Sequence, residues 1–191
     1  MCKRRAEVED EISFVKARES FAWTLERAHS QGKLPLKVTH NDTKLNNILF
    51  DKYNGRALSV IDLDTIMPGY SVNDFGDFIR FGATTALEDE RDLSKVSFDI
   101  SLYEIYVKGF IEGAKGGLCD SEIEMLPIGA LMMTYECGMR FLTDYLSGDT
   151  YFRISREKQN LDRARNQFKL LSDMEKKLPE MRAIIKKYSQ K

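Results

Sequence analysis

Four polar residues between positions 42 and 62 have the types and spacing for metal-assisted group transfer. Asp42 is a carboxylate that can accept a proton, Lys44 stands two residues beyond it, and Asn47 stands five residues beyond it. A second carboxylate, Asp62, follows a short apolar run. Amide and carboxylate oxygens are the hard ligands that Mg²⁺ prefers. The pattern therefore predicts a general base beside a magnesium site.

Two short apolar runs, at 48–50 and 57–61, must position these side chains as a hairpin. Asn54-Gly55 between them is a strong turn signal, because both residues tolerate positive φ. A two-residue turn there would place Asn47 directly opposite Asp62, with Cβ atoms roughly 4.5 to 5.5 Å apart. We therefore expect the two side chains to share one cation. A longer turn would shift the register, and the alternative is an ordinary polar hairpin with solvated ends.

Composition narrows the class of protein. The 191 residues are 42% hydrophobic and 31% charged, which suits one globular domain over residues 1–191. The net charge of −1 lacks the positive excess that is typical of proteins that bind nucleic acid. No apolar run approaches the ~18 residues of a membrane span, and the first residues lack the apolar core of a signal peptide. The cysteines Cys2, Cys119 and Cys137 are too widely spaced for structural zinc, so we expect a cytoplasmic protein.

Outside the hairpin the apolar residues recur at helical spacing, so the predicted fold class is mainly α. Ser121 and Glu124 match a capping box at the start of a helix predicted over 121–147. Leu178-Pro179 should end a helix predicted over 155–177, because proline disrupts a helix interior. The predicted helices span about 7–30, 74–86, 93–113, 121–147 and 155–177, and a short strand is predicted at 36–39.

Two strings, HNDTKLNNILFD from His40 and VIDLDTIMPGYSVNDFGDFIRFGA from Val60, carry a family resemblance. The chain resembles the C-terminal lobe of the aminoglycoside phosphotransferase and choline kinase-like superfamily, whose members are small-molecule kinases with a protein-kinase-like fold. Together with MTYECGMRFLTDYLSGDTYF, the strings look most like N-acetylhexosamine 1-kinases, which use ATP to phosphorylate the anomeric hydroxyl of GlcNAc or GalNAc. The resemblance implies a catalytic loop and hairpin at 36–65 and a helical substrate-binding subdomain at about 74–191.

The resemblance also implies roles for the polar residues of the hairpin. Asp42 would be the catalytic base, and Lys44 would face the transferred phosphoryl group. Asn47 and Asp62 would hold Mg²⁺ against the phosphates of ATP, the co-substrate. Asp64, two residues beyond Asp62, would be either a further metal ligand or a loop-capping group.

Two further residues are implied to be structural. His40 would brace the catalytic loop rather than transfer protons. The string Asp74-Phe75-Gly76 spells the metal motif of protein kinases, but it lies 32 residues after Asp42, whereas Asp62 lies 20 after it. The shorter separation fits a single hairpin, so Asp62 is the predicted ligand. Asp74 would instead accept backbone hydrogen bonds from the catalytic loop.

The resemblance makes Arg140 and Tyr151 the contacts to a small-molecule sugar substrate. Their alternatives are a snorkelling or salt-bridged arginine and a partly buried loop aromatic. An arginine in the substrate pocket would argue against a cationic substrate.

Only 41 residues precede Asp42, and they show no Gly-rich phosphate loop. Kinases of this fold place their nucleotide-binding lobe before the catalytic loop, so we expect a C-lobe whose N-terminal nucleotide lobe is absent. The chain alone should turn over far more slowly than ~1 s⁻¹, the low end for kinases. The face that would meet the other lobe should favour self-association.

Other functions remain open at this stage. The chain could be a non-catalytic sugar-binding or interaction module built on a kinase lobe. It could be a kinase for another small alcohol, such as choline or an aminoglycoside. It could also be a metal-dependent hydrolase or a glycosyltransferase that uses Asp62 and Asp64 as a metal motif, although the helical pattern speaks against a strand-rich nucleotide-sugar domain.

Overall fold

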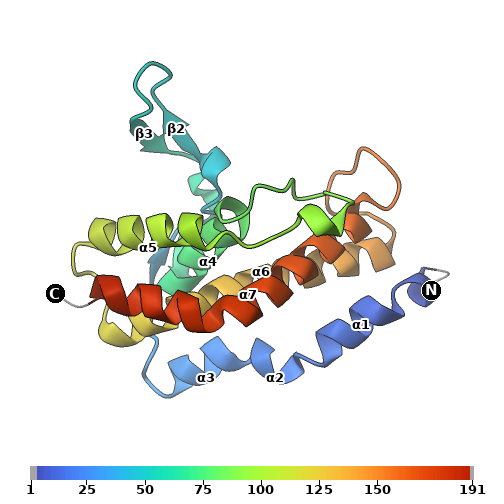
Figure 1. Cartoon of the computed structure of the whole chain (residues 1–191), viewed down its shortest axis with the longest axis horizontal. Coiled ribbons are helices and arrows are strands. Elements are labelled where there is room, and N and C mark those ends of the chain that lie inside the picture. Colours follow the sequence, from blue (N-terminus) through green and yellow to red (C-terminus); the bar gives the residue numbers. More distant parts are fainter. Residues whose placement is uncertain (1–3, 190–191) are drawn as a thin grey trace.

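The computed structural model describes residues 4–189, and most of them are helical (Figure 1). Cys2 lies outside the described residues. The prediction of a mainly α chain is confirmed. The helices are α1 (Glu9–Lys16), α2 (Glu19–Ala22), α3 (Thr24–Ser30), α4 (Ser71–Gly82), α5 (Ile100–Ala114), α6 (Asp120–Ser147) and α7 (Gln159–Ser189). The strands are β1 (Lys37–Thr39), β2 (Ile48–Phe50), β3 (Ala57–Val60) and β4 (Met67–Gly69).

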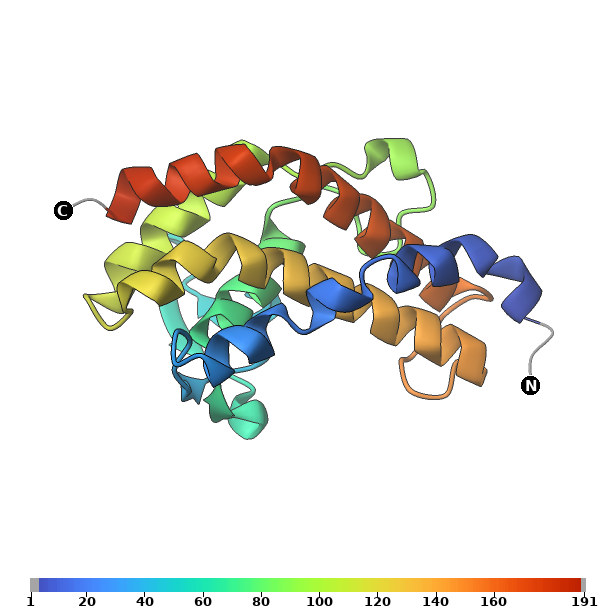
Figure 2. The ribbon, with the colours of Figure 1, turned by 90° about the horizontal axis from the view of Figure 1, so that it is seen from below.

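The long helix α6 is the centre of the helical body. Figure 2 shows it running through the middle of the molecule, with α7 along one side and the N-terminal helices along the other. Helix α4 also packs on α6, and Gly76 and Gly129 meet where the two cross. A Cβ atom at either glycine would collide with the backbone of the opposite helix, so this close approach requires glycine.

Apolar side chains from these helices fill the main core. Their spacing of three and four residues places them on one face of each helix. The most buried are Val72, Phe75 and Ile79 of α4, Leu126, Ala130 and Tyr135 of α6, and Leu170, Leu171 and Met174 of α7. This packing fixes α4 in place, and α4 in turn supports the loop that begins at His40.

A two-stranded antiparallel sheet connects the loop that begins at His40 to α4. In it β1 pairs with β4, and Thr39 lies opposite Met67. The chain leaves β1 at His40, and it leaves β4 into the first turn of α4. The sheet therefore brings the start of the loop next to the start of α4, although the two are about 30 residues apart in sequence.

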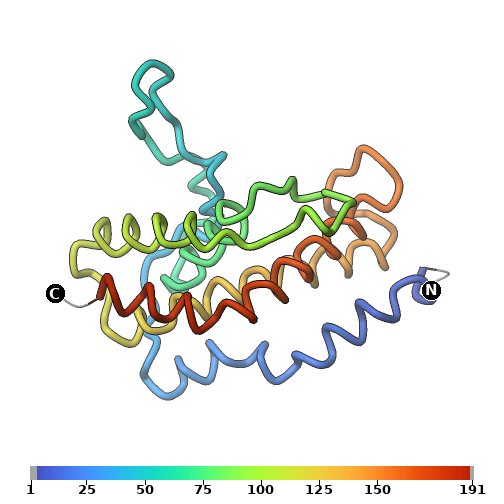
Figure 3. The backbone as a smooth tube through the Cα atoms, viewed as in Figure 1, coloured from blue at the N-terminus to red at the C-terminus, as the bar shows by residue number. Residues whose placement is uncertain are grey.

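The hairpin β2–β3 stands clear of the helical body (Figure 3). Its side chains Leu49 and Leu58 are exposed, as are Phe50 and Val60.

Among the described residues, none of the helices has the length and apolar character needed to cross a membrane.

The predicted register of this hairpin is wrong by one residue. Ile48 pairs with Val60 and Leu49 with Ser59, and the N–H of Ile61 donates to the carbonyl of Asn47. Asn47 therefore lies opposite Ile61 rather than opposite Asp62.

A longer turn and a β-bulge together explain this shift. The turn alone would move the pairing by two residues, and the irregularity between Leu49 and Phe50, where Leu58 is the extra residue, brings it back by one. The Asp51 N–H donates to the carbonyl of Arg56, which leaves four residues in the turn. The Asp51 carboxylate accepts hydrogen bonds from the amides of Tyr53 and Asn54, at 2.8 and 3.1 Å, and so stabilises the wider turn. Gly55 takes a φ of +70°, as the turn signal predicted, but it closes the turn instead of forming its centre.

Several helix boundaries also differ from the sequence predictions. Helix α4 spans Ser71–Gly82 rather than about 74–86, and α5 begins at Ile100 rather than at 93. The N-terminal helix is three short helices, broken at Ala17-Arg18 and at Trp23. Helix α6 is capped by Cys119, whose N–H donates to Glu122 at 2.8 Å, rather than by Ser121. Helix α7 continues through the exposed Pro179, because buried side chains on both sides, such as Met174 and Met181, hold it on the core.

Candidate active site

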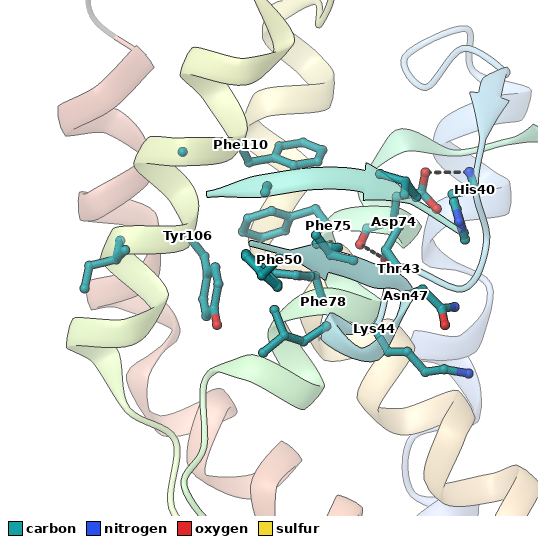
Figure 4. Close-up of a pocket in the computed structure, with 16 residues that line it drawn as sticks. His40, Thr43, Lys44, Asn47, Phe50, Asp74, Phe75, Phe78, Tyr106 and Phe110 are labelled. Atoms are coloured by element: carbon teal, nitrogen blue, oxygen red, sulfur yellow. Dashed lines mark hydrogen bonds between the residues drawn. The ribbon is translucent and has the colours of Figure 1, made fainter. Parts of the chain in front are cut away.

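The loop from His40 to Asn47 is anchored by the carboxylate of Asp74, on the first turn of α4. The amides of His40 and Asn41 donate to its two oxygens at 2.8 and 2.7 Å, and the Thr43 hydroxyl donates to its backbone carbonyl (Figure 4). Burial raises the pKa of the Asp74 carboxyl above its ordinary value, although the two backbone hydrogen bonds oppose this. Asp74 thus makes the backbone contacts that the resemblance implied.

A second set of contacts fixes the sharp bend at Asn41, which has a φ of +63°. Asparagine tolerates this left-handed conformation better than most residues. Its side chain donates to the carbonyl of Thr65 at 2.9 Å, and the Thr65 hydroxyl donates to the carbonyl of His40 at 2.6 Å. Thr39 donates to the side-chain oxygen of Asn41 at 2.9 Å. These residues, which the sequence analysis did not single out, set the direction in which the loop leaves β1.

Both ring nitrogens of His40 are engaged within the protein. Nδ1 accepts from the N–H of Asp42 at 3.3 Å, so it carries no proton, and Nε2–H donates to the carbonyl of Ile61 at 3.1 Å. The ring therefore joins the loop to the end of β3. A histidine held in this way has no free nitrogen for proton transfer.

The side chains of Asp42, Lys44 and Asn47 converge on one oxygen. Asp42 Oδ2 accepts from Lys44 Nζ at 2.8 Å and from Asn47 Nδ2 at 2.8 Å. Burial by itself would raise the pKa of the Asp42 carboxyl, but the hydrogen bonds from Lys44 and Asn47 and the lysine charge outweigh it, so this pKa is lowered. Asp42 is therefore ionised at neutral pH and held in one orientation.

Asn47 is the buried member of this group, and the sequence folds it there through a short 3₁₀ turn, Leu45–Asn47. Its Nδ2 donates both to the backbone carbonyl of Asp42, at 2.9 Å, and to the Asp42 carboxylate. Both N–H bonds of the amide are thereby used. The amide oxygen has no hydrogen-bond partner among the described residues and is available as a ligand.

Asp62 and Asp64 lie just beyond β3 and are exposed. Asp62 adopts a left-handed conformation with φ of +62°, and neither carboxylate has an ion-pair or hydrogen-bond partner in the described part of the chain. A non-glycine residue in this conformation carries strain that often marks a functional site. The hydrogen bond between Ile61 and Asn47 brings the Asp62 backbone beside Asn47.

These donors fit magnesium and not a closed protein cage. Within residues 4–189, no group of three or more histidine, cysteine, aspartate or glutamate side chains could hold a metal. Mg²⁺ usually keeps several waters and binds one or two protein carboxylates together with substrate phosphates. The amide oxygen of Asn47 and the carboxylate of Asp62, neither of which has a partner in the described residues, are ligand types that could contribute to such a partial set.

A cavity of about 660 Å³ lies between the hairpin and helices α4 and α5. Figure 4 shows its aromatic rings gathered on one side, with Lys44 and Asn47 on the other. The rings are those of Phe50, Phe75, Phe78, Tyr106 and Phe110.

Arg140 and Tyr151 line a different hollow of about 630 Å³, at the far end of α6. The Arg140 guanidinium lies 5.8 Å from the ring centre of Tyr151 and 5.4 Å from that of Phe152. This hollow shares no lining residue with the cavity beside Lys44. The structure therefore brings Arg140 and Tyr151 together, as the resemblance implied, but in a hollow of their own.

The loop that carries Tyr151 is held by Asp144, which is buried. The carboxylate accepts hydrogen bonds from the amides of Thr150, Tyr151 and Phe152 and from the side chain of Asn160, all at 2.8 to 2.9 Å. Sequence reasoning missed this residue. One feature of the sequence could have indicated it: Asp144 lies in the last turn of a helix. A negative charge there interacts unfavourably with the helix dipole, so an aspartate at this position indicates a compensating contact.

Comparison with known families agrees with this geometry. Residues 1–100 match the phosphotransferase enzyme family (APH). The chain belongs to this family. The matched segment contains the loop from His40 to Asn47, the hairpin and α4, whereas Arg140 and Tyr151 lie beyond it. Membership places the chain among the phosphotransferases of the kinase-like superfamily, as the sequence strings predicted, and leaves its acceptor open.

In this phosphotransferase, Asp144→Asn should loosen the loop that presents Tyr151. An asparagine has one acceptor oxygen and one donor group, so at least one of the four buried donors would lose its partner. We expect the free energy of unfolding to fall by about 1–3 kcal/mol, measured by denaturant titration. Asp64→Asn is the matched control, because its exposed carboxylate has no partner in the described residues, and it should leave stability unchanged.

The same contacts predict a dependence on pH. Burial raises the pKa of Asp144, but the hydrogen bonds from Phe152, Tyr151 and Thr150 outweigh it, so the folded-state pKa is lowered. Its stabilising contribution is therefore complete above the unfolded-state pKa, about 3.9, and is lost as pH falls through the lower folded-state pKa. Equal acid sensitivity in the Asp144→Asn variant and the wild type would contradict this assignment.

Proposed function

We propose that the chain is the metal- and acceptor-binding lobe of an ATP- and Mg²⁺-dependent kinase that phosphorylates the anomeric hydroxyl of an N-acetylhexosamine. The observation that carries the proposal is the convergence of Lys44 and Asn47 on one oxygen of Asp42. The closer family resemblance supports the choice of sugar. The general activity follows from the family; the acceptor and the cofactors are our proposal.

Asp42 acts as the general base in this proposal. Its Oδ2 is occupied by Lys44 and Asn47, whereas its Oδ1 has no hydrogen-bond partner in the described residues. The free oxygen is the one that can accept the proton of the sugar hydroxyl. Holding the other oxygen by two donors keeps the carboxylate ionised and fixes the direction of the free one.

Lys44 supplies positive charge next to the base. Phosphoryl transfer spreads negative charge over the equatorial oxygens of the transferred group, and a fixed cation stabilises that charge. Lys44 and Asn47 both donate to Oδ2 of Asp42. The lysine ammonium is therefore held next to both the proposed base, Asp42, and the proposed metal ligand, Asn47.

Asn47 and Asp62 would hold Mg²⁺, with Asp64 as a further candidate ligand. When bound, the ion would neutralise charge on the ATP phosphates. The residues themselves supply orientation. Asn47 is buried and immobilised by Asp42, and Asp62 follows Ile61, whose N–H donates to the Asn47 carbonyl.

Arg140 would bind the hydroxyl groups of the sugar, with Tyr151 beside it. The guanidinium is exposed and makes no ion pair in the described part of the chain, so its N–H groups are free to donate. A free arginine disfavours a cationic acceptor such as choline.

Arg140→Ala should therefore weaken sugar binding about tenfold or more, because hydrogen bonds from a charged donor are worth roughly 1.5–3 kcal/mol. Calorimetric titration with N-acetylglucosamine would measure this. Arg153→Ala is the matched control: Arg153 is an exposed arginine in the loop that carries Tyr151, and its variant should leave affinity unchanged. Equal affinity in the Arg140 variant and the wild type would remove Arg140 from the sugar site.

The proposed activity itself is tested by transfer of the γ-phosphoryl group of ATP to N-acetylglucosamine. The protein is used in excess over the sugar for several hours, so that transfer much slower than ~1 s⁻¹, the low end for kinases, is still detected.

A further inference from the structure

The N-terminal segment, defined here as residues 4–11, lies against the loop at 148–158, which joins α6 to α7 and carries Tyr151. Figures 1 and 2 both place this segment at the end of the molecule where α6 ends and α7 begins. A hydrogen bond between Arg4 and Tyr145 joins residues that are 141 positions apart in the chain. The segment is therefore placed to act on the hollow of Arg140 and Tyr151.

One buried side chain and one ion pair fasten the N-terminal segment to the body of the protein. Val8 has no exposed surface and belongs to the same apolar cluster as Phe141 of α6. The carboxylate of Glu7 accepts a hydrogen bond from Lys158 Nζ, at the end of the loop, at 2.6 Å. These contacts hold the backbone of the segment beside the loop, so the side chain of Arg4 can reach it.

Arg4 makes three contacts where α6 ends. Its Nη1 donates to the backbone carbonyl of Tyr145 at 2.7 Å and to the carboxylate of Asp149 at 2.5 Å. Its guanidinium carbon lies 4.6 Å from the centre of the Tyr145 ring. Carbonyls in the last turn of a helix lack intrahelical donors, and a cation there also suits the helix dipole. Arg4 therefore joins the N-terminal segment to the end of α6 and to the loop together.

The loop folds around two carboxylates that are nearly buried. The side chain of Asp149 is 5% exposed, and Asp144 is 5% exposed. Nδ2 of Asn160 donates to both, at 2.9 and 2.8 Å, so the two negative charges lie close together. Like charges repel, and a carboxylate removed from water needs a partner. In the described part of the chain, Arg4 is the only cation that forms an ion pair with either of them.

The backbone of Asp149 also depends on these contacts. Its φ of +61° is left-handed, a conformation that costs free energy for a residue other than glycine. Tyr151 follows two residues later, and it is 73% exposed, so it has little packing of its own to fix its position. The placement of Tyr151 therefore depends on how Asp149 is held.

We propose that Arg4 is a positioning residue for the acceptor site. By pairing with Asp149 it holds the loop in the conformation that sets the Tyr151 ring 5.8 Å from the Arg140 guanidinium. Resting on the proposed function, the ligand of this hollow is the acceptor sugar. Binding of the sugar and docking of the N-terminal segment then favour each other, because a coupling between two sites is reciprocal.

Hydrogen exchange in the 191-residue chain without sugar tests the first step. Arg4→Gln removes the charge and keeps a donor, so the amides at 150–152 should exchange about tenfold faster or more, since Asp149 loses its only cation. Amides in the middle of α6 and α7 should exchange at the wild-type rate. Arg5→Gln is the matched control, because the neighbouring Arg5 pairs with Glu9 at the surface, where both side chains are exposed, and it should leave the loop unchanged.

Sugar affinity tests the second step and separates positioning from a merely structural role. At a temperature well below the melting of either variant, Arg4→Gln should weaken binding of N-acetylglucosamine about three- to tenfold, measured by calorimetric titration, and Arg5→Gln should not. Binding of Mn²⁺ and ATP at the hairpin should stay at the wild-type level in both variants. Faster exchange throughout the helices, together with weaker binding of both ligands, would mean general destabilisation and would overturn the inference.

A double variant tests whether Arg4 acts through Asp149. Asp149→Asn should weaken sugar binding as Arg4→Gln does, and the two changes together should cost no more than the larger of the single losses, because both remove one interaction. Losses that multiply would show that the two residues act independently and would contradict the proposed pair.

The reciprocal effect gives a further readout. Saturating N-acetylglucosamine should slow exchange of the amides of Glu7 and Val8, which donate to the carbonyls of Arg4 and Arg5, in the wild type but not in Arg4→Gln. Unchanged exchange of these amides would contradict the coupling.

The outcomes distinguish this inference from the function on which it rests. If the sugar binds the wild type and Arg4→Gln equally well, the role of Arg4 is wrong while the sugar assignment stands. If N-acetylglucosamine fails to bind the wild type, the proposed acceptor is wrong, and exchange at 150–152 alone decides whether Arg4 holds the loop. Wild-type exchange at 150–152 in Arg4→Gln would overturn the inference whatever the sugar does.

Discussion

Asp42→Asn should lower the rate of phosphoryl transfer about 10²- to 10⁴-fold, the usual contribution of a positioned base. Asparagine keeps the shape of the side chain and can still accept a hydrogen bond from Lys44 or Asn47. It cannot accept a proton, so the step that fails is the activation of the sugar hydroxyl. Single-turnover transfer of label from ATP to N-acetylglucosamine measures the rate.

Sugar affinity should remain nearly intact in the same variant, because the loss concerns a chemical step and not a binding contact. Asp120→Asn serves as the matched control: Asp120 is an exposed aspartate at the start of α6, far from the loop in sequence, and its variant should transfer label at the wild-type rate. An Asp42→Asn variant with full activity would contradict the assignment of the catalytic loop.

Asp62→Asn should weaken binding of the metal–nucleotide complex tenfold or more. The substitution replaces a charged ligand by a neutral one, and a unit charge about 4 Å from another is worth several kcal/mol near a protein surface. Titration with Mn²⁺ in the presence of ATP, followed by electron paramagnetic resonance, measures the change directly. Sugar affinity should not change, since Asp62 makes no contact with the Arg140 hollow.

Asp64→Asn removes the same charge two residues further along the chain. A wild-type Mn²⁺ affinity in this variant would mean that Asp62 alone provides the charged ligand, whereas a comparable loss would make Asp64 a second one. Unaltered Mn²⁺ binding in the Asp62 variant would contradict the metal site proposed at the end of the hairpin.

The meeting of Asp42, Lys44 and Asn47 could be predicted from sequence because their contacts are local. Asp42, Lys44 and Asn47 lie within six residues, so their spacing in the chain largely determines that they meet. The anchoring of the loop by Asp74 came only from the family resemblance. Its physical basis is the short β1–β4 sheet, whose second strand the sequence did not reveal.

The register of the hairpin could not be read from its turn signal. Asn54-Gly55 predicted a turn, and the structure has one. The turn is wider than predicted, because the Asp51 carboxylate accepts hydrogen bonds from the backbone amides of Tyr53 and Asn54. A side-chain hydrogen bond worth about 1 kcal/mol is enough to choose between turns of similar energy. The wider turn, together with the bulge at Leu58, moves Asp62 from the position opposite Asn47 to the one beyond it.

Long-range contacts set the other differences. The proline at 179 does not end α7, because the tertiary packing of Met181 and Ile185 outweighs the local preference. Asp144 was not a candidate, because its importance depends on which backbone amides the fold brings to its carboxylate. Such positions become visible only when the packing of α6 on α7 is known.

The most direct test of the proposed function is the chemical identity of the labelled product. An excess of the 191-residue chain is incubated with N-acetylglucosamine, Mg²⁺ and ATP carrying a radioactive γ-phosphoryl group, and the products are separated. The account predicts a labelled sugar 1-phosphate, recognisable by its lability in acid, that forms with the wild type and is reduced to background with Asp42→Asn. Label found only as inorganic phosphate, or equal amounts of sugar phosphate from both proteins, would contradict it.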